Sequence, residues 1–111
     1  MQFIDTHSHL YSSQFDEDRT NAVNEAIAAG VSTILLPNIS SEYTKGMLEL
    51  CSEFPNNCFP MMGLHPCDVK EENIKEELAH VEEELVKGIY IAVGEIGLDL
   101  YWDKTKLEIQ K

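Results

Sequence analysis

Short apolar runs alternate with longer amphipathic segments along the whole chain. Runs typical of β-strands lie at 2–7, 31–38, 58–65 and 89–97. Segments with apolar residues at helical spacing lie at 15–30, 40–55 and 70–87, and a further one begins at 103. Each strand and helix together span about 30 residues, the size of a βαβ unit. This alternation predicts parallel strands joined by right-handed crossover connections.

Two segments carry more specific expectations about burial. The run VSTILLPN at 31–38 is nearly all apolar, which predicts a strand that is buried on both faces. The segment KEENIKEELAHVEEELVK at 70–87 is mainly acidic, and we interpret its charges as a solvated helix face. The apolar residues of that helix, which we expect to face the core, are Ile74, Leu78, Val81 and Leu85.

Parallel β/α units fit either a doubly wound sheet or a (β/α)8 barrel. No GxGxxG or GxxxxGK[ST] phosphate loop, which marks many doubly wound sheets, occurs in the chain. Polar residues instead stand at the carboxyl end of every predicted strand: His7, His9, Asn38, His65, Glu95 and Asp99. In a barrel these ends converge on one mouth, where active sites lie. We therefore predict an α/β fold of TIM-barrel type, covering about the first four β/α units.

Composition limits the partners that the chain can bind. It carries 8 Lys and Arg residues against 20 Asp and Glu residues, a net charge of −12. Extensive binding to nucleic acid depends on basic surfaces, so any such contact is expected to be local and assisted by metal. Three cysteines without CxxC spacing, and no apolar run near the roughly 20 residues of a membrane helix, predict a cytoplasmic protein without membrane contact.

The segment FIDTHSHL at 3–10 places two histidines one residue apart. In a strand, alternate side chains share a face, so Asp5, His7 and His9 would point the same way. Two imidazoles and the carboxylate of Glu95, which has no neighbouring Lys or Arg to pair with, can hold a divalent cation. Such a cation lowers the pKa of a bound water and polarises a phosphoryl or carbonyl oxygen.

The two remaining histidines carry weaker signals. His65 precedes Pro66 at the end of the third predicted strand, which suits either a turn residue or a residue of the site. His80 lies in the middle of the acidic helix among glutamates, and we interpret it as a structural residue.

Three segments together, FIDTHSHL at 3–10, GLHP at 63–66 and VGEIGLDLYW at 93–102, resemble the TatD-type metal-dependent deoxyribonucleases. The resemblance spans the chain and implies an amidohydrolase-like TIM barrel. Its mouth would bind two divalent metal ions, usually Mg²⁺ or Mn²⁺, with Zn²⁺ also compatible with histidine ligands. The implied activity is hydrolysis of DNA phosphodiester bonds by metal-activated water, largely from the 3′ end.

The resemblance also implies roles for individual residues. His7 and His9 would bind one metal ion, and Glu95 would be the catalytic carboxylate that bridges both ions. His65 would contact the substrate phosphate. Asp5 would orient a ligand, and Asp99 would line the pocket as a polar support. The family's remaining ligands, two later histidines and an aspartate, have no counterpart in this chain.

A full TIM barrel needs around 250 residues, so we interpret 1–111 as the N-terminal half of one metal-dependent hydrolase domain. Its first and fourth strands would be unpaired edges, which predicts self-association or a missing C-terminal half. The expected partner is DNA, as single strands or 3′ ends. Two other functions remain open: a truncated, non-catalytic metal-binding or interaction module, and an amidohydrolase-type enzyme that acts on a carbonyl substrate.

Overall fold

The computed structural model describes all 111 residues and contains one sheet of four parallel strands. The strands are β1 (Phe3–Asp5), β2 (Val31–Pro37), β3 (Cys58–Met62) and β4 (Ala92–Val93). The α-helices are α1 (Arg19–Ala28), α2 (Ser41–Glu53), α3 (Ile74–Leu85) and α4 (Leu107–Gln110), and 3-10 turns lie at Ser13–Phe15, Pro66–Asp68 and Lys104–Lys106. The strand order β1-β2-β3-β4, with every neighbouring pair parallel, confirms the predicted β/α alternation.

The outer strands are shorter than the sequence pattern predicts. β1 ends at Asp5 rather than at residue 7, and β4 contains two residues where the pattern predicts 89–97. Each outer strand has a neighbouring strand on one side only. Its length is therefore limited to the residues that form hydrogen bonds with that one neighbour. As a result His7, His9 and Glu95 lie in the segments directly after the strands, not within them.

Helices cover one face of the sheet, and the core lies under them. Its buried residues are Tyr11, Val23, Ile34, Leu36, Met47, Leu50, Cys58 and Met62. The alternate residues Leu35, Phe59 and Met61 are only partly buried. The prediction that 31–38 is buried on both faces is therefore wrong for this chain. In a TIM barrel this second face points to the interior, where the remaining strands cover it.

Helix α3 turns part of its acidic face toward α2. Glu77 and Glu84 are 8% and 7% exposed, whereas Leu78 and Leu85, which the sequence pattern placed toward the core, are 56% and 37% exposed. The expectation that both leucines face the core is therefore wrong for this chain. Glu77 accepts hydrogen bonds of 3.0 Å from the backbone N–H of Ser41 and 2.8 Å from its hydroxyl, at the start of α2. A carboxylate is favourable there because the first turn of a helix leaves N–H groups unpaired. The interpretation of 70–87 as a wholly solvated face is wrong for these two glutamates.

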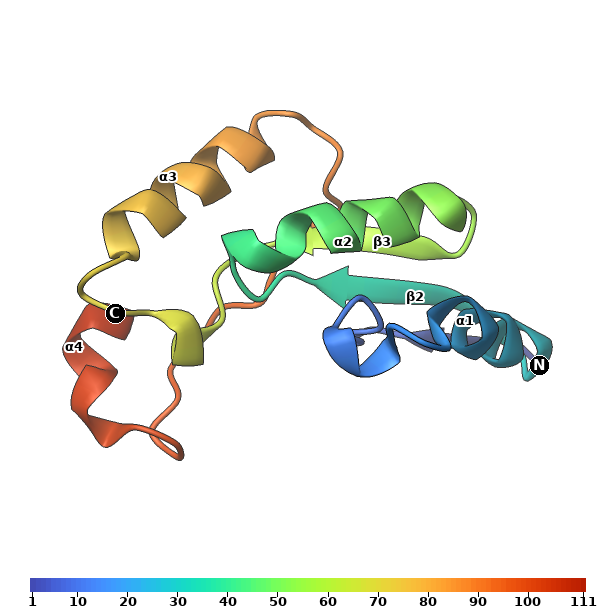
Figure 1. Cartoon of the computed structure of the whole chain (residues 1–111), viewed down its shortest axis with the longest axis horizontal. Helices are drawn as coiled ribbons and strands as arrows, with labels where there is room; N and C mark the ends of the chain where they lie inside the picture. Colours follow the sequence, from blue (N-terminus) through green and yellow to red (C-terminus); the bar gives the residue numbers. More distant parts are fainter.

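The segments that follow the strands gather at one end of the molecule. In Figure 1 the arrowhead of β2 points toward the end where α4 lies, and the N-terminus lies at the opposite end. All four strands are parallel, so their carboxyl ends face the same way. The polar residues that the sequence places after each strand therefore share one end of the sheet.

All three cysteines, Cys51, Cys58 and Cys67, are free thiols in the structure. Burial raises the pKa of the Cys51 thiol to about 12 and that of the Cys58 thiol to about 11, so both stay protonated near neutral pH. No helix in the structure combines the length and the apolar character needed to cross a membrane. The cytoplasmic location stays a prediction.

Candidate metal centre

Three side chains from the two ends of the chain converge beyond β1 and β4. His7 Nε2 lies 3.0 Å from Glu95 Oε2, and His9 Nε2 lies 3.1 Å from the same oxygen. The two imidazole nitrogens are 3.1 Å apart. Because β1 and β4 are the opposite edges of the sheet, this contact requires the sheet to curve, as the sheet of a barrel does. The residues expected from the sequence to hold a metal thus come together.

A buried tyrosine fixes the tautomer of His9. The Tyr11 hydroxyl donates its one proton to the carbonyl of Pro37, so it accepts a hydrogen bond from His9 Nδ1 over 2.9 Å. With its proton on Nδ1, neutral His9 presents the lone pair of Nε2 to the cluster. The pKa of His9 is lowered, mainly by burial and also by the neighbouring His7, although the Glu95 carboxylate acts to raise it, and this favours the neutral ring.

The role of Tyr11 was not expected from the sequence. The spacing of the residues could have indicated it, because Tyr11 follows His7 and His9 at the same interval of two residues. Metal-binding histidines commonly donate their second N–H to a neighbouring acceptor, and Tyr11 stands at a suitable position. Burial also raises the pKa of the Tyr11 hydroxyl, which therefore keeps its proton.

His65 is oriented as a donor toward Glu95. Its Nδ1 accepts a hydrogen bond of 3.0 Å from the backbone N–H of Cys67, so in the neutral ring Nε2 carries the proton. This Nε2 lies 3.2 Å from Glu95 Oε1, while the two other histidines face Oε2. A protonated Nε2 suits an anionic oxygen better than a metal ion, and the contact of His65 with substrate phosphate stays a prediction.

Backbone contacts hold the loops that carry the cluster. The Asp5 carboxylate accepts a hydrogen bond of 3.1 Å from the N–H of His7, so it supports the loop and not the imidazole ring. The carbonyl of the fully buried Asn38 accepts a 3.1 Å bond from the N–H of Glu95. The Asn38 amide donates to the Gly63 carbonyl over 3.1 Å. Asn38 therefore joins the segments after β2, β3 and β4.

Asp99 lies outside the cluster and organises the loop after β4. Its Oδ1 accepts hydrogen bonds from the backbone N–H groups of Tyr101 (2.9 Å) and Trp102 (3.2 Å). Its Oδ2 accepts one of 3.3 Å from Cys67 Sγ. The two backbone bonds hold the pKa of Asp99 below its ordinary value. Asp99 thus lines a pocket formed by the segments after β3 and β4 and does not touch the three clustered side chains; its role as a polar support of the active site stays a prediction.

The fourth histidine, His80, makes no contact with the cluster. His80 Nε2 lies 2.8 Å from the hydroxyl oxygen of Thr44, which joins α3 to α2. Thr44 is buried and its hydroxyl also lies 3.4 Å from Asn38 Oδ1. His80 therefore stabilises the packing of α3 against α2, in agreement with its interpretation as a structural residue.

The donor set of the cluster suits a cation. The tautomer of His9 leaves its Nε2 without a proton, and this nitrogen faces both Glu95 Oε2 and His7 Nε2. A divalent cation would satisfy the three acceptor atoms together and balance the carboxylate charge. This is the one group of three or more potential ligands in the chain, so a second ion would need further ligands.

The curved parallel sheet, with potential metal ligands at the carboxyl ends of its strands, defines the N-terminal half of a TIM barrel. The sequence profile of the family described as TatD related DNase matches residues 4–111. The chain belongs to this family, which confirms the resemblance seen in its three motifs.

Similar proteins come from several bacteria. The uncharacterized metal-dependent hydrolase YabD of Bacillus subtilis is 32% identical over 108 residues, which is 97% of this chain and 42% of that protein. A 3′-5′ ssDNA/RNA exonuclease TatD of Pectobacterium carotovorum is 33% identical over 93 residues, 82% of this chain and 35% of that protein. This chain therefore spans well under half the length of these relatives.

A solved structure confirms the fold. The crystal structure of YjjV, a TatD homologue from Escherichia coli, matches with a TM-score of 0.85 and 33% sequence identity. The match covers 97% of this chain and 42% of that one. The four β/α units thus correspond to part of a longer barrel, as the TIM-barrel prediction requires.

Proposed function

We propose that this chain is the N-terminal half of a metal-dependent hydrolase that cleaves phosphodiester bonds in DNA from the 3′ end. The observation that carries the proposal is the convergence of His7, His9 and Glu95 within 3.1 Å of one another. Membership of the TatD related DNase family supports it, as does the similarity to a protein named as a 3′-5′ ssDNA/RNA exonuclease.

His7, His9 and Glu95 would hold the metal ion, which we propose to be Mg²⁺ or Mn²⁺, with Zn²⁺ also compatible with these ligand types. Their ligand atoms lie within 3.1 Å of one another. When bound, such an ion supplies a Lewis acid and lowers the pKa of water.

The protein groups around the ligands have separate tasks. Tyr11 holds the proton of His9 on Nδ1 and so keeps Nε2 free as a ligand. Through its protonated Nε2, His65 would donate a hydrogen bond to an anionic phosphate oxygen next to Glu95. These two tasks distinguish the histidine that binds metal from the one that binds substrate.

The charge of the chain favours a local contact with single strands or frayed 3′ ends. At a net charge of −12, few phosphates can be neutralised, so the affinity should depend only weakly on salt. A slope of log affinity against log salt near that of an extended duplex binder would contradict this picture.

Activity would also require the rest of the barrel, from a C-terminal half or from a second copy of the chain. Apolar side chains at both edges of the sheet are exposed, among them Ile4 at 63% and Val93 at 52%. Such edges favour association. Light scattering should then give a mass above the 12.6 kDa of one chain, and a stable monomer would contradict self-association.

The test is cleavage of 5′-labelled single-stranded DNA in Mg²⁺ or Mn²⁺ by the completed barrel, formed either by the self-associated chain or by the chain together with a C-terminal half. We expect stepwise shortening from the 3′ end that EDTA abolishes. Glu95→Gln should reduce the rate by orders of magnitude, whereas Glu76→Gln, at an exposed position of α3, should not. Cleavage that persists in EDTA, or an unchanged rate in the Glu95→Gln protein, would refute the proposal.

A further inference from the structure

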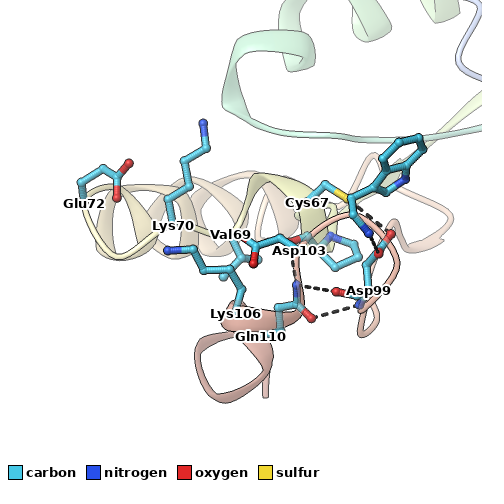
Figure 2. Close-up of a pocket in the computed structure, with 10 residues that line it drawn as sticks. Cys67, Val69, Lys70, Glu72, Asp99, Asp103, Lys106 and Gln110 are labelled. Atoms are coloured by element: carbon cyan, nitrogen blue, oxygen red, sulfur yellow. Dashed lines mark hydrogen bonds between the residues drawn. The ribbon is translucent and has the colours of Figure 1, made fainter.

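A pocket of about 310 Å³ lies between the segments that follow β3 and β4, and its lining includes none of the three clustered residues. In Figure 2 Lys70 and Lys106 extend from one side of it, while Cys67 and Asp99 lie on the other. Cys67 connects it to the cluster, because its backbone N–H binds His65, which in turn contacts Glu95. This volume is at the lower end of the roughly 300–1,000 Å³ of small-molecule sites, so it has room for one small ligand.

Two aromatic side chains stand exposed on the loop at this pocket. Tyr101 is 80% exposed and Trp102 is 77% exposed, and their rings meet edge to face with centroids 4.8 Å apart. Trp102 itself lines the pocket. Large aromatic surfaces left in water are unfavourable, and side by side they mark a binding surface.

The loop that carries these rings is held in place from two sides. Asp99 accepts hydrogen bonds from the backbone N–H groups of both aromatic residues. The side chain of Gln110 accepts a 2.9 Å bond from the N–H of Asp99 and donates one of 3.1 Å to the Pro66 carbonyl. The backbone that carries the aromatic pair is therefore held before any ligand binds, which reduces the part of the entropy cost of binding that comes from ordering the loop.

Two lysines line the same pocket, together with three acidic residues. Lys70 and Lys106 are two of the eight Lys and Arg residues in the chain, and neither forms an ion pair. Two of the three acidic residues that line the pocket already have donors. Asp99 binds the loop backbone, and Asp103 accepts a 2.7 Å bond from the N–H of Thr105. The two lysines thus remain available to an anion.

We propose that this pocket binds one nucleotide of single-stranded DNA, with the base against Trp102 and Tyr101 and a phosphate near Lys70 and Lys106. The proposal deepens the proposed function and rests on it. Aromatic rings stack on any base, but only where the base is unpaired, and lysines attract the phosphate that links it to its neighbour. The pocket therefore selects single strands and holds the strand next to the cluster, despite the acidic surface of the chain.

Trp102 is the one tryptophan of the chain, so its fluorescence reports directly on this pocket. We would titrate the full chain in EDTA, where metal-dependent cleavage is blocked, with a short single-stranded oligodeoxyadenylate. The comparison ligands are its duplex with oligodeoxythymidylate and an abasic strand of the same length. We expect saturable quenching by the single strand, and at least tenfold weaker binding of the duplex and of the abasic strand.

Variants separate stacking from charge. Tyr101→Ala should weaken binding of the single strand about tenfold, since a stacked ring contributes on that scale. Trp102→Ala, followed by the anisotropy of a labelled strand, should do the same, with Trp102→Phe in between. Lys70→Gln and Lys106→Gln should weaken binding and reduce its salt dependence, whereas Lys75→Gln, exposed on α3, should match the unaltered chain.

The outcomes distinguish this proposal from the proposed function. Quenching as described, with no metal-dependent cleavage even by the completed barrel, would support the pocket and count against the hydrolase. Cleavage of DNA at strand concentrations that leave Trp102 fluorescence unchanged would overturn the pocket and leave the hydrolase standing. Equal quenching by single strand, duplex and abasic strand would also overturn it, because base recognition would then be absent.

Discussion

Replacing Tyr11 with phenylalanine removes the hydroxyl that fixes the orientation of His9. In the structure this hydroxyl donates to the Pro37 carbonyl and accepts from His9 Nδ1 over 2.9 Å. Tyr11 is 5% exposed, so water does not readily replace the lost group. The substitution keeps the ring in the core, and what it removes is the pair of hydrogen bonds.

Two consequences can be estimated. First, the imidazole of His9 becomes free to rotate or to change tautomer, and loss of such a supporting bond typically weakens metal binding by about 10- to 100-fold. Second, the Pro37 carbonyl loses this donor inside the protein, which costs about 1–3 kcal/mol of unfolding free energy. Tyr43→Phe is the matched control. Its ring packs against that of Tyr11 with centroids 5.9 Å apart, and its hydroxyl forms no hydrogen bond.

The assay is calorimetric titration of both variants with Mn²⁺, together with urea unfolding followed by circular dichroism. We expect weaker Mn²⁺ binding and lower stability in Tyr11→Phe, with both quantities close to those of the unaltered chain in Tyr43→Phe. Unchanged Mn²⁺ affinity in a folded Tyr11→Phe protein would refute the idea that Tyr11 holds His9 as a ligand. An equal loss in Tyr43→Phe would show a general packing effect instead.

Three further predictions concern stability, geometry and pH. Glu77→Ala should lower the unfolding free energy by about 1–3 kcal/mol in urea melts, because two buried bonds to α2 are lost, whereas the exposed Glu76→Ala should change it by less than about 0.5. Gly63→Ala would place a Cβ 2.7 Å from the Glu95 carbonyl oxygen, so the loop that carries Glu95 must move. Mn²⁺ affinity should therefore fall, and an unchanged calorimetric titration would contradict this. The pKa of His9 is lowered from 6.5 by burial, so the unfolded chain binds more protons there, and stability should decrease as the pH falls below 6.5. His9→Gln should flatten that decrease in urea melts at several pH values, and an unchanged pH profile would argue against it.

The sequence predicts the parts of the site that follow from periodicity and chain position. Polar residues at the ends of apolar runs indicate which side chains share the mouth of a barrel, and His7, His9 and Glu95 do meet there. Parallel order also follows from the alternation of strands and helices. The shared position of the polar residues and the parallel strand order can both be predicted, because each depends on patterns within short stretches of the sequence.

Contacts between distant segments could not be predicted in the same way. The tautomer of His9 depends on a carbonyl of β2 that Tyr11 reaches across 26 positions. The burial of Glu77 depends on donors at the start of α2, which the amphipathic pattern of α3 does not reveal. The partial exposure of the second face of β2 could not be predicted for the same reason. An apolar run does not show whether the segments that would cover its second face lie within the chain.

The most direct test of the central claim is electron spin-echo spectroscopy of the chain with bound Mn²⁺. If His7, His9 and Glu95 hold the ion, the spectrum should show coupling to imidazole nitrogens, reduced in His7→Gln and in His9→Gln. Glu95→Gln should weaken the binding itself. Mn²⁺ bound without nitrogen coupling, or coupling that survives the loss of both histidines, would contradict the assignment of this cluster as the metal centre.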